Sequence, residues 1–311
     1  MVPTTPESQP PSSSGSRGAT LTGSGWNVTV ASVGAELVSV RTPSGRELLW
    51  DAGPQWRRHA PILFPCIGRS PADSVTVDGV VYPMPQHGFA RDMAFTLVDT
   101  SDDTAEFELV SDDHTRRHYP FDFALRVRHR VRGSYLTSDY TIANTGSRSM
   151  PASFGLHTAF LWPTEPGARN SSTVVFAEDQ ADRVHRVVDG VPMPQSQPSP
   201  LAGRTLNLTD TLFDAGAVVF ERVSGTEVRY RSEATGSLTL TWAGFEQFAV
   251  WSPPSGAGFV CLEPWAGLPA LETSDGELGS RPASLAIPPG QDRAFSCTVK
   301  VDAEQPRQKN G

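Results

Sequence analysis

The sequence contains few cysteines and no long apolar run. Its 311 residues include three cysteines, Cys66, Cys261 and Cys297, which lie far apart and show no C-x-x-C spacing. This pattern predicts neither a disulfide framework nor a zinc site, and it is typical of a protein from a reducing compartment. No stretch of about 18 uninterrupted apolar residues occurs, so the sequence predicts no transmembrane helix.

Positive charge is also scarce. Lys and Arg number 26 against 34 Asp and Glu, which gives a net charge of -8, and the basic residues are scattered. We therefore expect neither nucleic acid nor a membrane as a partner. Residues 1–22 are rich in Pro, Ser, Thr and Gly and lack the apolar segment of a signal peptide, so they predict a disordered tail and a cytoplasmic location. Residues 304–311 are expected to form a second tail, and residues 23–303 a single domain.

The common motifs of nucleophilic and nucleotide chemistry are missing. The sequence has no G-x-S-x-G, so a serine triad lacks support. It has no G-x-G-x-x-G or Walker pattern, so nucleotide binding lacks support as well. A metal site that combines His87, His157 and a carboxylate is compatible with the spacing, but no H-x-H or H-E-x-x-H motif points to it. We expect no metal ion.

What the sequence does contain is a repeated alternation of strands and turns. "SVTVDGVVYPM" predicts a hairpin around Asp78-Gly79, and "AELVSVRTPSGRELLW" predicts another around Ser44-Gly45. In "FALRVRHRV", residues 123–131, apolar residues alternate with arginines and place His129 on the apolar side. No window of ten residues has a helical period, so helices should be few and short. These features predict an all-β antiparallel fold, with two stacked sheets or a barrel.

One long loop is expected. Residues 180–205 are rich in proline and polar residues, and we expect them to form a long surface excursion.

Four other stretches place polar side chains among aromatics, prolines and glycines, as a partly apolar pocket requires. They are "APILFPCIGRS" (60–70), "PMPQHGFARD" (83–92), "SFGLHTAFLWP" (153–163) and "FVCLEPWAGLP" (259–269).

Glu263 and His157 are the strongest candidates for chemistry in these stretches. Glu263 ends a strongly apolar run, where a carboxylate is paired, hydrogen-bonded or held with a raised pKa. His157 is surrounded by glycine, alanine and aromatic residues. One imidazole and one carboxylate in apolar surroundings form a natural general acid and base. Three tryptophans are candidates to stack on a sugar or to form the pocket wall: Trp162, Trp251 and Trp265.

At these residues the chain resembles the aldose 1-epimerases, or galactose mutarotase-like proteins, and especially their LacX-like branch. The similar pieces are "APILFPCIGR", "YPMPQHGFARD", "GLHTAFLWP" and "VCLEPWAGLP", in that order, together with the closing "LAIPPGQDRAFSCTVKV". The resemblance implies a large antiparallel β-sandwich of the supersandwich kind, with a sugar bound in a cleft across one sheet. It also implies that no cofactor is needed.

The resemblance further implies roles for individual residues. Glu263 corresponds to the base and His157 to the acid of an aldose 1-epimerase. The residues that correspond to contacts with sugar hydroxyls are His87, Arg69 and Asp214, and Arg91 braces the His87 loop or contacts the sugar. The family implies a small sugar as the partner and isomerisation of an aldohexose as the reaction. Two alternatives stay open, a hexose-6-phosphate 1-epimerase and a non-catalytic carbohydrate-binding protein on the same fold.

Overall fold

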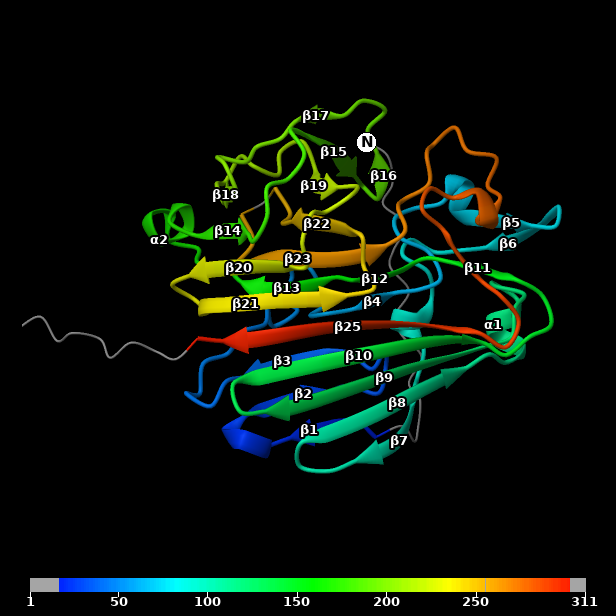
Figure 1. Ribbon diagram of the computed structural model, residues 1–311, viewed down its shortest axis with the longest axis horizontal. Helices are drawn as coiled ribbons and strands as arrows, with labels where there is room; N and C mark the ends of the chain where they lie inside the picture. The colour runs from blue at the N-terminus through cyan, green and yellow to red at the C-terminus, as the bar shows by residue number, and fades with distance from the viewer. Residues whose placement is uncertain (1–16, 255, 303–311) are drawn as a thin grey trace, which may run out of the picture.

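The computed structural model describes residues 17–254 and 256–302 (Figure 1). Two large antiparallel sheets dominate it, which confirms the predicted all-β sandwich. The first sheet runs in the order β18 (Thr205–Asn207), β14 (Thr173–Phe176), β20 (Glu227–Ser232), β21 (Gly236–Ala243), β25 (Asp292–Val301), β10 (Tyr135–Asn144), β9 (Phe123–Arg132), β8 (Thr104–Val110), β7 (Thr96–Thr100). The second runs in the order β16 (Val191–Pro192), β15 (Arg183–Val188), β19 (Ala217–Phe220), β22 (Gln247–Trp251), β23 (Phe259–Ala266), β12 (Phe154–Leu156), β4 (Ile62–Leu63), with β13 (Thr158–Leu161) also on β23 and β17 (Gln197–Pro198) also on β15.

Smaller elements complete the described part of the chain. The short sheets are β1 (Ala19–Leu21), β2 (Asn27–Val30) and β3 (Leu37–Arg41), then β5 (Ser74–Val77) with β6 (Val80–Pro83), and β11 (Met150–Ala152) with β24 (Leu285–Ile287). Helical segments are as few and short as predicted: α1 (Asp113–Arg116), α2 (Pro166–Asn170), and 3-10 turns at Gly23–Gly25, Pro71–Asp73, Ala90–Asp92 and Leu278–Ser280. Neither α-helix in residues 17–254 and 256–302 has the length and hydropathy of a membrane span.

The strand pattern follows the sequence closely. Along β9, buried and exposed residues alternate as predicted, and His129 is buried, with its ring nitrogens hydrogen-bonded to the Ser138 hydroxyl and the Ala35 carbonyl. The β5–β6 hairpin turns at Asp78 and Gly79, both with positive φ, as a two-residue hairpin turn requires.

Three sequence expectations need correction. The chain does turn near Gly45, but its return is made of isolated bridges rather than a second strand. Strand β15 and its two short partners β16 and β17 lie within residues 180–205, because residues 185–187 of "RVHRVV" pair with β19 instead of forming a surface excursion. Strand β1 lies within the tail expected over 1–22, since its two apolar residues are buried. The rest of that tail, residues 1–16, and the tail at 304–311 lie outside the described residues.

The two faces of the second sheet have different surroundings. Along β23, Val260 and Leu262 belong to the main core, where the two sheets pack together. Cys261 and Trp265 belong to two smaller clusters. Because side chains alternate along a strand, Glu263 shares the face of Cys261 and Trp265, opposite the main core. This outer face of the second sheet carries the candidate site.

Candidate active site

The pairing register of β23 brings His157 and Glu263 together. Strands β12 and β13 pair with β23 in one continuous antiparallel register, in which Gly155 lies opposite Trp265 and Thr158 lies opposite Leu262. His157, between the two short strands, therefore falls directly across from Glu263. On the other side of Glu263, strand β22 places the small side chain of Ala249.

The two side chains face each other in a desolvated setting. Nε2 of His157 lies 3.4 Å from Oε2 of Glu263, and Glu263 is 1% exposed. Burial raises the pKa of the Glu263 carboxyl well above its usual value, and the nearby Trp265 indole opposes this rise. Burial lowers the pKa of His157 to about 3, and the positive charge of Arg91 contributes. Both shifts favour the uncharged form of the group, as expected for a buried acid and base pair.

Aromatic rings border the pair. The Trp56 ring stacks on the His157 ring, with centroids 4.9 Å apart and an interplanar angle of 27°. The Trp251 ring meets His157 edge-on at 5.5 Å. Both tryptophans are half-buried, so part of each ring is available to a ligand. Of the tryptophans singled out from the sequence, Trp251 lies beside the pair. Trp56 was missed, although a lone tryptophan in the polar loop "GPQWRRHA" was a usable signal.

The other two tryptophans are packed away from solvent. Trp162 is 1% exposed, its indole N–H donates to the Arg169 carbonyl, and the Arg169 guanidinium lies over its ring. Trp265 is buried in one of the two small apolar clusters on the outer face. In this arrangement neither ring offers a broad face for stacking on a sugar.

His87 is held beside the pair by an unusual backbone turn. Both His87 and Gly88 have positive φ, and the Gly88 segment bridges to Phe64. The Gly68 N–H donates to Nδ1 of His87 at 3.1 Å, so the neutral ring carries its hydrogen on Nε2. Burial lowers the pKa of His87 well below its usual value, and its ring meets that of His157 edge-on at 5.5 Å. Nε2 of His87 also lies 3.3 Å from the side-chain amide of Gln86, so the loop presents a neutral imidazole that is contacted at both ring nitrogens.

Three arginines surround the two histidines. Arg91 and Arg58 both lower the pKa of His157 through their charge, and Arg281 joins them in lowering that of His87. The guanidinium of Arg91 also donates to the Gln86 carbonyl at 2.7 Å, which braces the His87 loop as the sequence suggested. The result is a positive field beside the acid and base.

Arg281 was not found by sequence reasoning. It is 6% exposed and donates to the Ile67 carbonyl at 2.6 Å and to the Ser70 hydroxyl at 2.9 Å. These bonds tie the "IGRS" segment, whose Gly68 orients His87, to the chain near residue 281. Nothing in the local sequence "LGSRPAS" marks this arginine, because its partners lie more than two hundred residues away.

The side chains of the remaining two predicted contacts, Arg69 and Asp214, are not joined to the His157–Glu263 pair by a hydrogen bond or ion pair within the described residues. Arg69 has a half-exposed side chain whose guanidinium donates twice to Asp73, at 2.9 and 3.1 Å. Asp214 is exposed in the turn before β19, and its side chain makes no hydrogen bond or ion pair within the described ranges. The structure therefore brings together Glu263, His157, His87 and Arg91, and a sugar role for Arg69 and Asp214 stays a prediction.

A methyl group at position 88 would test how the loop holds His87. A Cβ on Gly88 would lie 2.1 Å from the Phe64 carbonyl oxygen, so the main chain would have to move. We expect Gly88→Ala to lower the free energy of unfolding by more than about 2 kcal/mol, because it adds a backbone clash to the positive-φ penalty. Urea unfolding monitored by tryptophan fluorescence measures this change.

Gly79→Ala is the matched control. Gly79 has nearly the same φ, +77° against +75°, but a Cβ there would meet nothing within 4 Å. We expect only the conformational penalty, about 1 kcal/mol. If both variants lose the same free energy of unfolding, the close approach of Gly88 to Phe64 does not explain the need for glycine at position 88.

Comparison with known proteins adds a second kind of evidence. Residues 19–278 match the family model described as aldose 1-epimerase. The chain is 27% identical over 262 residues to protein LacX of Lactococcus lactis, across 78% of this chain and 85% of LacX. A galactose mutarotase-like protein from Lactobacillus casei superposes with a TM-score of 0.86 at 27% identity, over 92% of this chain and 100% of that one. A protein of Escherichia coli provisionally named a glucose-6-phosphate 1-epimerase is 25% identical over 177 residues, 49% of this chain and 57% of that protein.

Proposed function

The chain belongs to the aldose 1-epimerase family, and we propose that it interconverts the α and β anomers of an aldohexose. The observation that carries this proposal is the buried His157–Glu263 pair, with Nε2 and Oε2 3.4 Å apart. A protein that only bound sugars would gain nothing from placing an ionisable carboxyl at 1% exposure opposite an imidazole. The half-buried rings of Trp56, Trp251 and His87 are the surfaces that a sugar would meet first.

The proposed reaction is a reversible ring opening. The Glu263 carboxylate takes the proton of the C1 hydroxyl, and the electrons of that O–H bond form the carbonyl. The C1–O5 bond breaks, and O5 takes a proton from Nε2 of His157. The free aldehyde then rotates about the C1–C2 bond, and ring closure on its other face returns both protons. Each positioned proton transfer contributes about 10²- to 10⁴-fold.

The pKa values of the two groups indicate which of them carries the proton that the reaction transfers. In the free protein this proton is on the Glu263 carboxyl, whose pKa is raised, because His157 is neutral above about pH 3. Ring opening needs the same proton on His157. The two states differ by one proton moved between atoms 3.4 Å apart.

Polarimetry on freshly dissolved sugars tests the proposal. We expect the protein to speed the change in optical rotation of α-glucose or α-galactose toward equilibrium, in proportion to its concentration. If neither hexose responds, the hexose 6-phosphates form the next panel. A folded protein that accelerates none of these reactions, but binds sugars in calorimetry, would be a carbohydrate-binding protein.

One observation favours a phosphorylated hexose as substrate. Arg91 and Arg58 both oppose protonation of His157, which the reaction needs. An anionic group on the sugar would offset their charge and stabilise the imidazolium. Arg58 is 19% exposed and its partner Asp92 is 47% exposed, so the guanidinium can exchange this surface contact for a phosphate. The similarity to the Escherichia coli protein named for glucose 6-phosphate supports the same reading.

Arg58→Ala should therefore separate the two substrate classes. We expect the variant to lose about 10- to 100-fold in kcat/KM for a hexose 6-phosphate, the effect of one charge-assisted hydrogen bond, with little change for the free hexose. Arg57→Ala, at the exposed neighbouring position, is the control and should leave both values nearly unchanged. Equal losses for phosphorylated and free sugar would exclude a phosphate contact at Arg58.

A further inference from the structure

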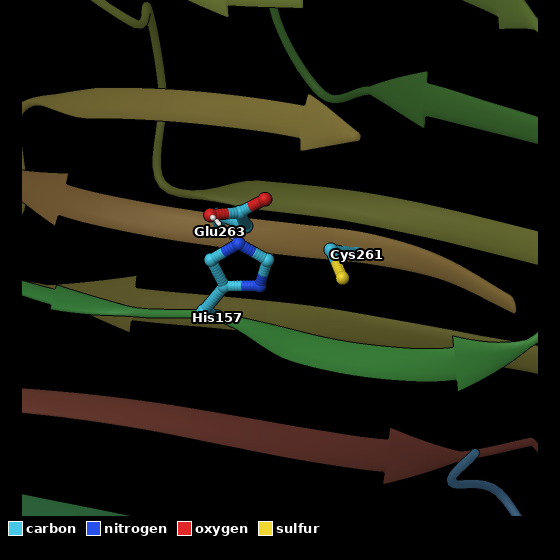
Figure 2. A group of neighbouring side chains, drawn as sticks. All are labelled: His157, Cys261 and Glu263. Atoms are coloured by element: carbon cyan, nitrogen blue, oxygen red, sulfur yellow. Dashed lines mark ion pairs between the residues drawn. The ribbon is translucent and has the colours of Figure 1, made fainter. Parts of the chain in front are cut away.

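Cys261 completes a cluster of three metal-ligand side chains. Its thiol, an imidazole nitrogen of His157 and a carboxylate oxygen of Glu263 all lie within 4.8 Å of one another, and all three side chains are buried. Figure 2 shows the group: Cys261 and Glu263 come from the same strand, the Glu263 carboxyl faces the His157 ring, and the Cys261 thiol lies to one side of the ring. Spacing along the sequence hides this set, because His157 comes from the neighbouring strand pair.

One ligand atom of the cluster has unused bonding capacity. Oε2 of Glu263 is buried and has no hydrogen-bond partner among the described residues. A carboxylate oxygen without a partner at this depth is costly, and a bound cation or proton would remove that cost. Oε2 lies 3.4 Å from Nε2 of His157, a separation longer than that of an ordinary hydrogen bond.

We propose that His157, Cys261 and Glu263 bind a thiophilic divalent cation such as Zn²⁺, and that the bound cation inhibits the proposed reaction of the protein. Sulfur, nitrogen and oxygen in one set suit zinc rather than magnesium or calcium, which take oxygen ligands. In a tetrahedral zinc site such atoms lie about 3.3 to 3.6 Å apart, so a contraction of about 1 Å by side-chain rotation completes the set. The fourth position stays open to water or a sugar hydroxyl.

The binding of zinc and the inhibition by zinc are supported by different observations. On binding, the Cys261 thiol and the Glu263 carboxyl each release a proton to solvent, and the metal takes lone pairs of the thiolate, of Nε2 and of the carboxylate. Those are the lone pairs that the proposed reaction uses for proton transfer, so the occupied protein cannot act as acid and base. Only the inhibition rests on the proposed function; the binding depends on the ligand geometry alone.

Zinc affinity can be measured without any activity assay. The full-length, reduced, metal-free protein is titrated with Zn²⁺ in competition with a chromophoric chelator of micromolar affinity. We expect one zinc per chain, and we expect Cys261→Ser to weaken the affinity by at least about 10-fold through loss of a thiolate ligand. Cys297→Ser removes a thiol buried in the main core, far from the outer face, and should leave the affinity unchanged.

Either of two results would overturn the proposal. In the first, the protein retains no zinc in competition with the chelator. In the second, the Cys261→Ser variant binds zinc as tightly as the unchanged protein. If Cys261→Ser does not fold, Cys261→Ala takes its place, and the zinc-induced rise in Tm is compared with that of the unchanged protein. If the protein is active, the zinc concentration that halves the rate is measured for each variant, relative to the rate of the same variant without zinc. A protein that binds zinc but turns over no sugar in its zinc-free state would disprove the proposed function without affecting the evidence for the metal site.

Discussion

We expect Glu263→Gln to slow the catalysed interconversion of anomers by about 10²- to 10⁴-fold, the contribution of one positioned proton-transfer group. The amide keeps the size of the side chain but cannot take the proton of the C1 hydroxyl. The buried position of Glu263 makes the test clean, because water cannot easily replace the missing base at 1% exposure. Initial rates of optical rotation, corrected for the spontaneous reaction, measure the loss.

Glu246→Gln is the matched control for this variant. Glu246 is exposed in the turn that leads into β22, on the same sheet, so removing its charge should leave the rate nearly unchanged. A Glu263→Gln protein that keeps most of the acceleration would show that Glu263 is not the base.

The same variant should also gain stability at neutral and alkaline pH. Burial raises the pKa of Glu263 above its value in the unfolded chain. Between these two pKa values the folded protein holds a proton that the unfolded chain has released, so the free energy of unfolding falls as the pH rises through that range. Glutamine has no such cost. We therefore expect Glu263→Gln to unfold at higher urea than the unchanged protein at neutral and alkaline pH, with the difference shrinking toward pH 4.5, the ordinary carboxyl value.

His157 gives a slope of the opposite sign, which must be kept apart from that of Glu263. Its pKa is lowered to about 3 in the folded protein, against 6.5 when unperturbed. Between these values the unfolded chain binds a proton that the folded protein does not, so stability rises with pH there. Above about pH 7 the imidazole is neutral in both states, and the difference between Glu263→Gln and the unchanged protein then reports Glu263.

Phe154→Ala should have the largest effect on stability. Phe154 lies in β12 of the second sheet, is fully buried, and its ring lies 5.2 Å from that of Tyr140 and 5.0 Å from that of Phe295, both in the first sheet. It therefore connects the two layers just behind the site. Deleting a buried phenylalanine ring costs about 3 to 5 kcal/mol in transfer and cavity terms. Urea unfolding should show a loss of this size.

Phe154→Leu distinguishes packing from simple apolarity. Leucine keeps most of the volume, so we expect a loss of about 1 to 2 kcal/mol. A loss for Phe154→Ala below about 1 kcal/mol would mean that the two sheets do not depend on this contact.

Much of the fold could be predicted from local pattern. The alternation in residues 123–131 predicts β9 and the burial of His129, and Asp78-Gly79 predicts the β5–β6 turn, because both signals depend on neighbours a few residues apart. Strand β15 was missed because proline and polar residues around "RVHRVV" hide a short alternation that becomes a strand only beside β19.

The candidate site divides in the same way. Glu263 and His157 could be found because each interrupts an apolar stretch, and the resemblance to the aldose 1-epimerases, now confirmed, named their roles. Arg91 could be found together with His87, because both lie in "PMPQHGFARD". The approach of Arg58 and Arg281 to His87 could not be found, because partners so distant in sequence carry no local signal.

The sequence by itself determined most of the segments that form strands, and it marked Glu263 and His157 as polar residues within apolar stretches. Only the tertiary structure decided that His157 lies across from Glu263, with Cys261 on the same face. The physical reason is register: antiparallel strands can pair in many alignments, and a shift of one residue would turn the imidazole to the opposite face of the sheet. The packing of the whole sandwich selects the alignment, and with it the site.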